Sequence, residues 1–293
     1  MNIQKMFLVF LFVLAGCVPV GSGTTTTGTS STILPTTTTT SAPTTTIPVG
    51  VSQTDMLQAQ LNTGNLTINE PVISDGSLFP PVGATITFGS NGKLIRTSAS
   101  TGSAIDVRAN GVTLNNVKVQ GPDPCFWKIP DNWGWPAQIG QMYSQYDPTR
   151  ESQHGIAIRA SQVTVNGAYV EGVWGDALYL DQGTGINVSN LTGRCMGRSG
   201  ISNVGASNVT ITGGSLSGAY WWIFNIEPWS TRTVNNYITS GIQVGFSRVQ
   251  RLYAGGPDFN CLVSGVDVSR NTILPEATNQ VFVADCVKSG IRY

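Results

Sequence analysis

Short strand-like triplets recur along this chain at a nearly constant spacing, and this repeat limits the possible folds more than any other feature. One series begins at Val112, Val163, Ile186 and Val209, so its successive steps are 51, 23 and 23. A second begins at Ile105, Ile156, Leu178, Ile201 and Phe224, with steps of 51, 22, 23 and 23. Apolar and polar residues alternate within the triplets, as in strands with one packed and one wet face. Such self-similarity indicates a repeat architecture.

A coil of about 22–23 residues with Asn and Gly at its corners predicts an all-β fold, a single-stranded right-handed parallel β-helix. Each strand would pair with its equivalent one coil later. Leucine-rich repeats have similar lengths, but their Leu-x-x-Leu-x-Leu frame is missing. The residues expected to point inward in stacked rows are Ile156, Ile158, Leu178, Leu180, Ile201, Phe224 and Ile226.

The one irregular step, 51 in place of 22, predicts an insertion of about 29 residues within 121–151. A loop of that length inside a regular solenoid usually has a function. Residues 53–62 have the pattern of a short helix that would cover the open first coil. We therefore expect one β-helix domain over residues 53–293.

Residues 1–16 have the pattern of an export signal, with Lys5 followed by an apolar run too short to span a bilayer as a permanent helix. The run ends in Leu14-Ala15-Gly16-Cys17, which resembles the bacterial lipoprotein cleavage box. That resemblance implies that Cys17 becomes the lipid-modified first residue and anchors the chain to a membrane outside the cytoplasm. An ordinary signal peptide with a free Cys17 is the alternative.

Residues 17–52 are predicted to form a disordered tether. Between Thr24 and Thr46 more than half of the positions are Thr, and most of the others are Ser, Pro, Gly and Ala. Such a composition cannot bury a core. The tether would hold the β-helix clear of the membrane.

Charge and cysteine content exclude some function classes. The formal net charge is zero, so the basic footprint of a nucleic-acid-binding protein is missing. With one histidine and no C-x-x-C spacing, no metal or other cofactor is expected. In an exported protein the remaining four cysteines favour disulfides, and we predict the pairs Cys125–Cys195 and Cys261–Cys286.

The chain resembles the pectate-lyase-like superfamily of β-helix proteins in three runs. These are Gly175-Asp-Ala-Leu-Tyr-Leu, Gly197-Arg-Ser-Gly-Ile-Ser and Phe224-Asn-Ile-Glu-Pro. The resemblance covers about residues 80–285. That superfamily includes polysaccharide lyases, glycoside hydrolases, epimerases and phage tailspikes, so the resemblance implies a fold without assigning a reaction. The catalytic signatures of polygalacturonases and classical pectate lyases are absent.

Stacking the coils places Arg159, Asp181, Val204 and Glu227 in one outward column. Asp181 and Glu227 would lie roughly 9–10 Å apart, near the upper end of the carboxylate separation in inverting glycosidases. Glu227 is the preferred general acid or base, because it faces outward and the preceding position of the column, Val204, offers no cation. In the alternative interpretation Arg159 simply pairs with Asp181 in an exposed ladder, worth at most about 1 kcal/mol.

A second candidate group joins Asp176 to Arg198, which the stacking brings close enough for an ion pair. Arg198 could bind a uronate carboxylate or stabilise the carbanion-like state of a lyase, provided that it is exposed. The alternative is a structural pair at the corner before a strand. His154 occupies the same coil position in an earlier coil, so it could line the same edge or be purely structural.

Tryptophans cluster around these positions. Flat indole faces suit stacking on sugar rings, although the same rings could instead fasten the inserted loop as a satellite core. The expected substrate-binding residues are Trp127, Trp133, Trp135, Trp174, Trp222, Trp229, His154 and Asn225.

The sequence thus supports a surface-anchored protein that binds extracellular polysaccharide and, as a hydrolase or lyase, cleaves it. A non-catalytic glycan-binding or adhesive lipoprotein is the alternative. A pure surface spacer would leave the tryptophans unexplained.

Overall fold

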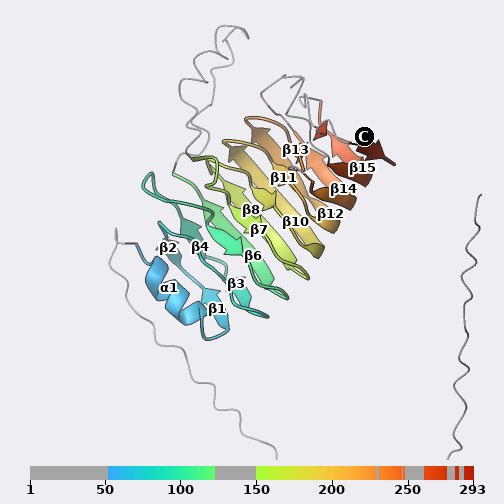
Figure 1. Ribbon diagram of the computed structural model, residues 1–293. Helices are drawn as coiled ribbons and strands as arrows, with labels where there is room; N and C mark the ends of the chain where they lie inside the picture. The colour runs from blue at the N-terminus through green and yellow to red at the C-terminus, as the bar shows by residue number, and fades with distance from the viewer. Residues whose placement is uncertain are drawn as a thin grey trace, which may run out of the picture. The chain divides into compact units, whose positions relative to one another are not determined.

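The computed structural model describes residues 52–122, 150–228, 231–245, 247, 261–275, 281–283 and 287–293. In these parts of the chain one helix accompanies seventeen strands, and the strands stack in two parallel sheets (Figure 1). The chain is therefore the predicted all-β parallel β-helix. No helix in the described ranges is long and apolar enough to cross a membrane.

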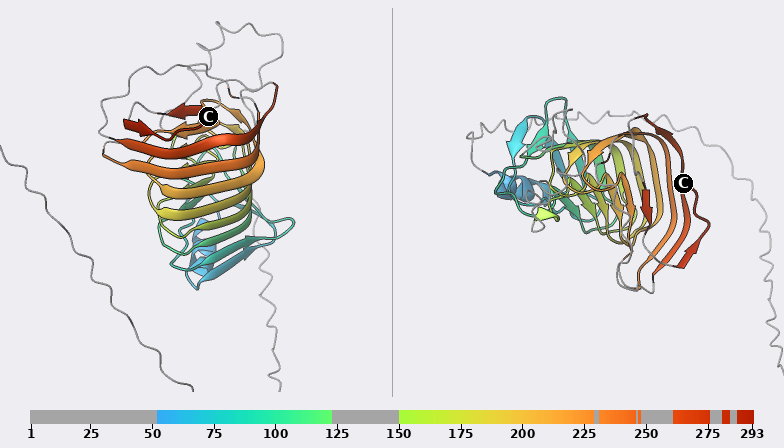
Figure 2. Two further views of the ribbon diagram at one scale, coloured as in Figure 1. Left: turned by 90° about the vertical axis from the view of Figure 1, so that its right-hand side faces the viewer. Right: turned by 90° about the horizontal axis from the view of Figure 1, so that it is seen from above.

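The long-strand sheet forms one side of the solenoid, in the order β1-β3-β6-β8-β10-β12-β14-β15-β17, with β2 beside β4 and β4 beside β6 (Figure 2). Its strands are β1 (Asn65–Ile68), β2 (Pro71–Ile73), β3 (Thr85–Phe88), β4 (Lys93–Ile95), β6 (Thr113–Gln120), β8 (Thr164–Glu171), β10 (Thr184–Met196), β12 (Ser207–Ala219), β14 (Thr233–Val244), β15 (Leu262–Ile273) and β17 (Val287–Ser289).

The short-strand sheet has six strands in the order β16-β13-β11-β9-β7-β5. They are β5 (Ile105–Val107), β7 (Ile156–Ile158), β9 (Leu178–Leu180), β11 (Ile201–Asn203), β13 (Phe224–Ile226) and β16 (Val281–Val283). Each is so short that it directs a single middle residue outward between two inward ones.

The core lies between the two sheets. All seven residues expected to point inward are at most 1% exposed, which confirms those stacked rows. Asn203 stands in the same inward column although it is polar. Its side chain donates to the carbonyl of Ala206 and accepts from the N–H groups of Gly205 and Ala206, so its polar atoms are satisfied within one turn.

The predicted period holds in the middle of the solenoid and lengthens toward the carboxyl terminus. Val188 pairs with Val165 on one side and with Ile211 on the other. The separation along the sequence is the same in both directions and equals the predicted repeat. Val209 pairs with Tyr237, and Tyr237 pairs with Val266, so these two coils are longer than the middle ones. In the short-strand sheet Phe224 of β13 pairs with Val281 of β16, because the chain passes through both β14 and β15 before it returns.

A bend divides each middle strand of the long-strand sheet into a first and a second arm. Equivalent residues at this bend, Asn116, Gly167, Asn190 and Gly213, have φ values of 52°, 79°, 53° and 69°. Asparagine and glycine are the residues that adopt this left-handed conformation most readily. The Asn and Gly corners seen in the sequence therefore set the cross-section of the coil.

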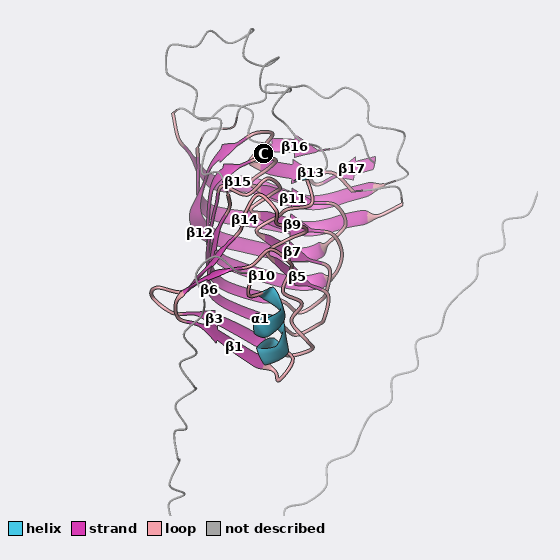
Figure 3. Ribbon diagram, turned by 90° about the vertical axis from the view of Figure 1, so that its left-hand side faces the viewer, coloured by secondary structure: helices cyan, strands magenta, loops and turns pink. Residues whose placement is uncertain are grey.

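Helix α1 (Thr54–Leu61) lies against β1 at the amino-terminal end of the stack (Figure 3). Leu57 and Leu61 are its buried residues, so the predicted covering helix is confirmed. The predicted leader, tether and most of the inserted loop lie outside the described residues.

Candidate functional site

The outer face of the short-strand sheet gathers most of the polar candidates. The alternation of the strands directs the middle residue of each strand outward, and the resulting column is Asp106, Ala157, Tyr179, Ser202 and Asn225. Four of these five residues are at most 4% exposed, and only Tyr179 has substantial exposure. Charged side chains that flank the column therefore form the accessible surface.

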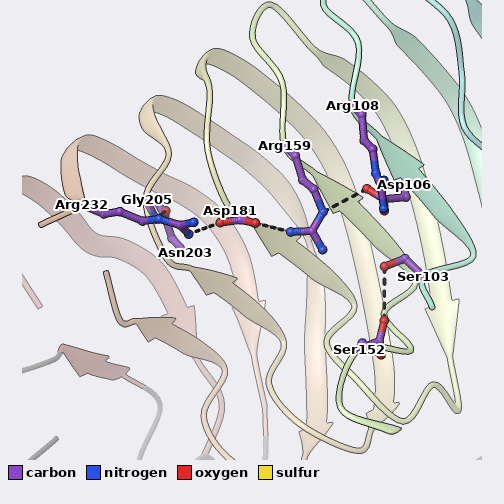
Figure 4. Close-up of polar contacts among 9 residues, drawn as sticks. All are labelled: Ser103, Asp106, Arg108, Ser152, Arg159, Asp181, Asn203, Gly205 and Arg232. Carbon is purple, nitrogen blue, oxygen red and sulfur yellow. Dashed lines mark hydrogen bonds and ion pairs between the residues drawn. The ribbon is translucent and has the colours of Figure 1, made fainter. Parts of the chain in front are cut away.

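One flank is a charged ladder of Arg108, Asp106, Arg159, Asp181 and Arg232 (Figure 4). Arg108 Nη2 lies 2.7 Å from Asp106 Oδ2, and Arg159 Nε lies 3.2 Å from Asp106 Oδ1. Arg159 and Arg232 each donate through Nη1 to Asp181, from opposite sides. The ion pair predicted between Arg159 and Asp181 is thus present, as one step of a longer row.

The arginines of the ladder are more exposed than its carboxylates. The side chains of Asp106 and Asp181 are 5% and 13% exposed, whereas those of Arg108, Arg159 and Arg232 are 63%, 31% and 34% exposed. Three guanidinium groups share two carboxylates, which leaves one positive charge in excess. The ladder therefore presents N–H donors to solvent above carboxylates that are less accessible than the arginines.

Arg232 reaches back across two coils to make its contact with Asp181. Its side chain passes over Gly205, where an added Cβ would lie 2.9 Å from Arg232 Cδ and 2.6 Å from the carbonyl oxygen of Asp181. A side chain at position 205 would close that path. Gly205 is therefore a requirement of the ladder.

The other flank, before the short strands, carries Glu151, His154, Asp176 and Arg198. Together with Glu227, which follows β13 and contacts Arg198, these residues form the Arg198 cluster. Arg198 Nη1 lies 3.1 Å from Asp176 Oδ2, Nη2 lies 3.6 Å from Glu227 Oε2, and Nε lies 3.9 Å from Glu151 Oε2. The predicted ion pair of Arg198 with Asp176 is present, and Arg198 binds two further carboxylates. Its own side chain is 12% exposed.

Asp176 is fully buried. Its Oδ1 accepts a 2.7 Å hydrogen bond from the Ser199 N–H. Burial raises the pKa of Asp176, but the charge of Arg198 and the hydrogen bond from the Ser199 N–H outweigh it and hold the pKa below its ordinary value. The catalytic role predicted for this pair needs exposure, and Asp176 has none, so it holds Arg198 in place instead of meeting a ligand.

Glu227 is the most exposed of the three predicted catalytic carboxylates, with 32% of its side chain accessible. Asn225 Nδ2 donates to its Oε2 at 3.3 Å. Val204 fills the preceding position of the column, as expected, but a cation from outside the column lies beside Glu227: Arg198, in the segment before β11, has its Nη2 3.6 Å from Glu227 Oε2. The single positive charge of Arg198 is therefore shared by Glu227, Asp176 and Glu151.

Tyr179 lies between the two flanks and was not among the sequence candidates. Its ring stacks on that of His154 with 4.3 Å between centroids, and the Arg159 guanidinium lies 5.3 Å from its centroid. Burial, and secondarily the charge of Asp181, raises the pKa of Tyr179, so its hydroxyl is a protonated donor at neutral pH. Its middle place in a three-residue strand was the signal that could have identified it.

His154 is buried, in the coil adjacent to that of Asp176. Its Nδ1 accepts a 3.0 Å hydrogen bond from the Asp176 backbone N–H. The stacking on Tyr179 and this bond together give His154 a structural role at the edge it was predicted to line.

The two described tryptophans of the predicted set differ in exposure. Trp174 is half-buried, with the Arg150 guanidinium 5.1 Å from its ring centroid. Trp222 is 4% exposed and contacts Trp221 edge to face at 5.2 Å, so it contributes packing. Trp127, Trp133, Trp135 and Trp229 lie outside the described residues.

Cys195 and Cys261 are buried. Their predicted partners, Cys125 and Cys286, lie outside the described residues, as does Cys17, so both pairings and the lipidation stay predictions. In the ranges that the structure describes, no group of three His, Cys, Asp or Glu side chains could hold a metal ion.

Comparisons of the chain with protein-family models, with curated proteins and with solved structures found no match. Function is therefore inferred from the site itself.

Proposed function

We propose that the protein is an exported, lipid-anchored β-helix protein that binds acidic extracellular polysaccharide on the outer face of its short-strand sheet. Cys17 would carry the lipid, and residues 17–52 would form the tether. The observation that supports this proposal is the charged ladder, in which Arg108 is exposed and Arg159 and Arg232 are partly exposed above two less accessible carboxylates.

Guanidinium groups recognise carboxylates and sulfates through paired N–H donors. The ladder arginines are held by Asp106 and Asp181 before any ligand arrives, so binding costs less side-chain entropy. Arg108 and Arg159 stand on successive coils, about 4.8 Å apart along the solenoid. This spacing suits a linear polymer that lies along the solenoid axis with its charged groups toward the ladder.

Neutral parts of a sugar would find partners beside the ladder. Tyr179 offers a hydroxyl donor, and Glu227 offers a partly exposed carboxylate acceptor. A few placed polar groups next to an aromatic ring are typical of small-molecule and sugar sites. Tyr179 and Glu227 would therefore set the orientation of the polymer.

Binding is better supported than cleavage. A catalytic acid or base must reach its substrate, but Asp176 is fully buried, and Asp181 is only 13% exposed and pairs with two arginines. The exposure of Glu227 keeps a hydrolase or lyase as the second candidate, with Glu227 as its acid or base and Asp181 or Arg198 in support.

Affinity electrophoresis of the full-length protein in gels with polygalacturonate, alginate, dextran sulfate or neutral dextran tests the proposal. We expect retention by the acidic polymers alone, weakening with salt. Arg108→Gln should lower the affinity about tenfold, because a hydrogen bond to a charged group contributes about 1.5–3 kcal/mol.

Arg270→Gln is the matched control. Arg270 is 62% exposed and pairs with the nearby Asp267 at 3.2 Å, much as Arg108 pairs with Asp106, but it lies on β15. Equal losses in both variants, or no retention by any acidic polymer, would contradict the proposal. Release of reducing ends or unsaturated uronates that Glu227→Gln abolishes would favour the enzyme instead.

A further inference from the structure

The first arms of the long strands carry a second ordered surface, which we call the neutral face. It consists of the outward residues of β1, β3, β6, β8, β10 and β12. One column is Asn65, Thr85, Thr113, Thr164, Asn187 and Thr210, and the other is Thr67, Thr87, Asn115, Asn166, Ser189 and Thr212. None of the twelve side chains is buried.

The neutral face has the geometry of a lattice. The six strands pair in parallel without a shift of register across these columns. Neighbouring strands lie about 4.8 Å apart, and alternate residues of one strand lie roughly 6.6 Å apart. The residues between the columns, such as Leu114 and Val165, are at most 3% exposed, so they anchor the array in the core.

All twelve residues are Thr, Asn or Ser, without a single charge or aromatic ring. A face that serves only solubility is expected to mix Lys, Arg, Glu and Asp at roughly a quarter to a third of its positions. The second arms of the same strands do carry such residues, among them Lys118, Glu171 and Arg194. The neutral composition therefore belongs to the first arms, not to the sheet as a whole.

Several of these side chains are fixed before any ligand arrives. Asn166 Nδ2 donates to Asn115 Oδ1 at 3.0 Å, and Asn115 Nδ2 donates to Thr87 Oγ1 at 3.3 Å. Threonine side chains are stiff at χ1 because they are β-branched. The array can thus bind a partner with little loss of side-chain entropy.

We infer that the neutral face binds ice. A rigid two-dimensional lattice of neutral donors and acceptors gains most from a partner with its own fixed lattice of donors and acceptors, because every contact then repeats at the next coil. In ice every oxygen both donates and accepts, and the repeat between its oxygen rows is close to the strand spacing. A flexible glycan or a protein surface would instead favour aromatic and charged contacts, which this face lacks.

The test is partition of the full-length protein into slowly growing ice, together with inhibition of ice recrystallisation. Asn187→Lys/Thr210→Lys places two charges in neighbouring strands of the array. Both side chains are exposed and outward, so the fold should be retained, as circular dichroism will show. Thr192→Lys is the control: Thr192 lies on the same strand β10 as Asn187, but in its second arm.

We expect the wild type and Thr192→Lys to enter ice and to suppress recrystallisation, and the double variant to lose at least tenfold in both measures. Exclusion of the wild type from ice would overturn the inference. So would a double variant that still enters ice, or one that loses only binding to crystalline cellulose or chitin, since the neutral face would then recognise a solid glycan.

Discussion

The charged ladder and the neutral face are built on the same coils and differ in the residues that lie beneath their accessible side chains. The ladder keeps two carboxylates nearly buried and exposes the arginines that bind them. The neutral face has only apolar residues beneath it, and its polar groups bond to one another along the column. The coil therefore sets the spacing of both surfaces, while the outward residue sets their chemistry.

The largest effect is expected from a substitution in the core, which should disrupt both surfaces together. Leu178 is fully buried in β9, between β7 and β11. Leu178→Asp places an unpaired charge in the core at a cost of several kcal/mol, and adjacent coils should unfold because each packs only on its neighbours. Thermal unfolding should show a broad loss of β-structure. Asn187→Asp, at an exposed outward position, is the control, and an unchanged melting temperature for Leu178→Asp would contradict the fold's dependence on this row.

A smaller loss of stability is expected from a substitution in the Arg198 cluster, which should leave the neutral face unchanged. Asp176→Asn removes the buried carboxylate beside Arg198 and leaves Glu151 and Glu227 as its partners, which should cost about 1.5–3 kcal/mol at pH 7, as for one hydrogen bond to a charged group. Because the folded-state pKa of Asp176 is lowered, its stabilisation is present above the unfolded value of about 3.9 and is lost as the pH falls below it. The difference in unfolding free energy between wild type and variant should therefore shrink below about pH 4. A difference that is constant with pH would show that Asp176 is not charged in the folded protein.

Gly205→Val should disturb the charged ladder and leave the neutral face intact. The added atoms meet the Asp181 carbonyl and the stem of Arg232, and such overpacking typically costs about 1–3 kcal/mol. We expect a lower melting temperature and weaker binding of acidic polymers, with ice partition unchanged. Arg232→Met, which keeps the stem and removes the charge, should weaken polymer binding without the steric cost. Equal polymer binding by both variants and the wild type would remove Arg232 from the ladder's function.

The smallest effect should be confined to the neutral face. Asn166→Ala breaks the bond to Asn115 and should lower stability by about 0.5–1 kcal/mol, as expected for one exposed hydrogen bond. Ice partition should fall modestly while binding to acidic polymers stays unchanged. A loss of polymer binding in this variant would mean that the two surfaces are not independent.

The rows of the core were predictable because apolar residues at a fixed period leave one way to stack them. The end of the regular period was not predictable. The longer coils that contain β14 and β15 are hidden from a search for the shorter repeat of the middle coils. The same irregularity concealed Arg232, whose side chain spans two coils.

The ladder was predicted in part. Arg159 and Asp181 follow equivalent strands, so their column was readable from the sequence. Asp106 carried the same kind of signal, because it is the middle residue of Ile105-Asp-Val107 and pairs with Ala157 of the next coil, but it was taken only as part of the repeat. The contact of Arg198 with Glu227 joins residues at opposite ends of the short strands. It depends on how far the two side chains extend over the sheet, which their coil positions alone do not predict.

The uniform register from β8 through β10 to β12 has a consequence for how such a chain can change in length. Both steps have the same length, and both have the left-handed bend at the same place. A duplicated gene segment encoding one such coil would insert between existing coils, extend the neutral face by one strand spacing of about 4.8 Å, and leave helix α1 and the carboxyl-terminal strands as they are. The length of the neutral face along the solenoid can thus change in evolution by one coil at a time.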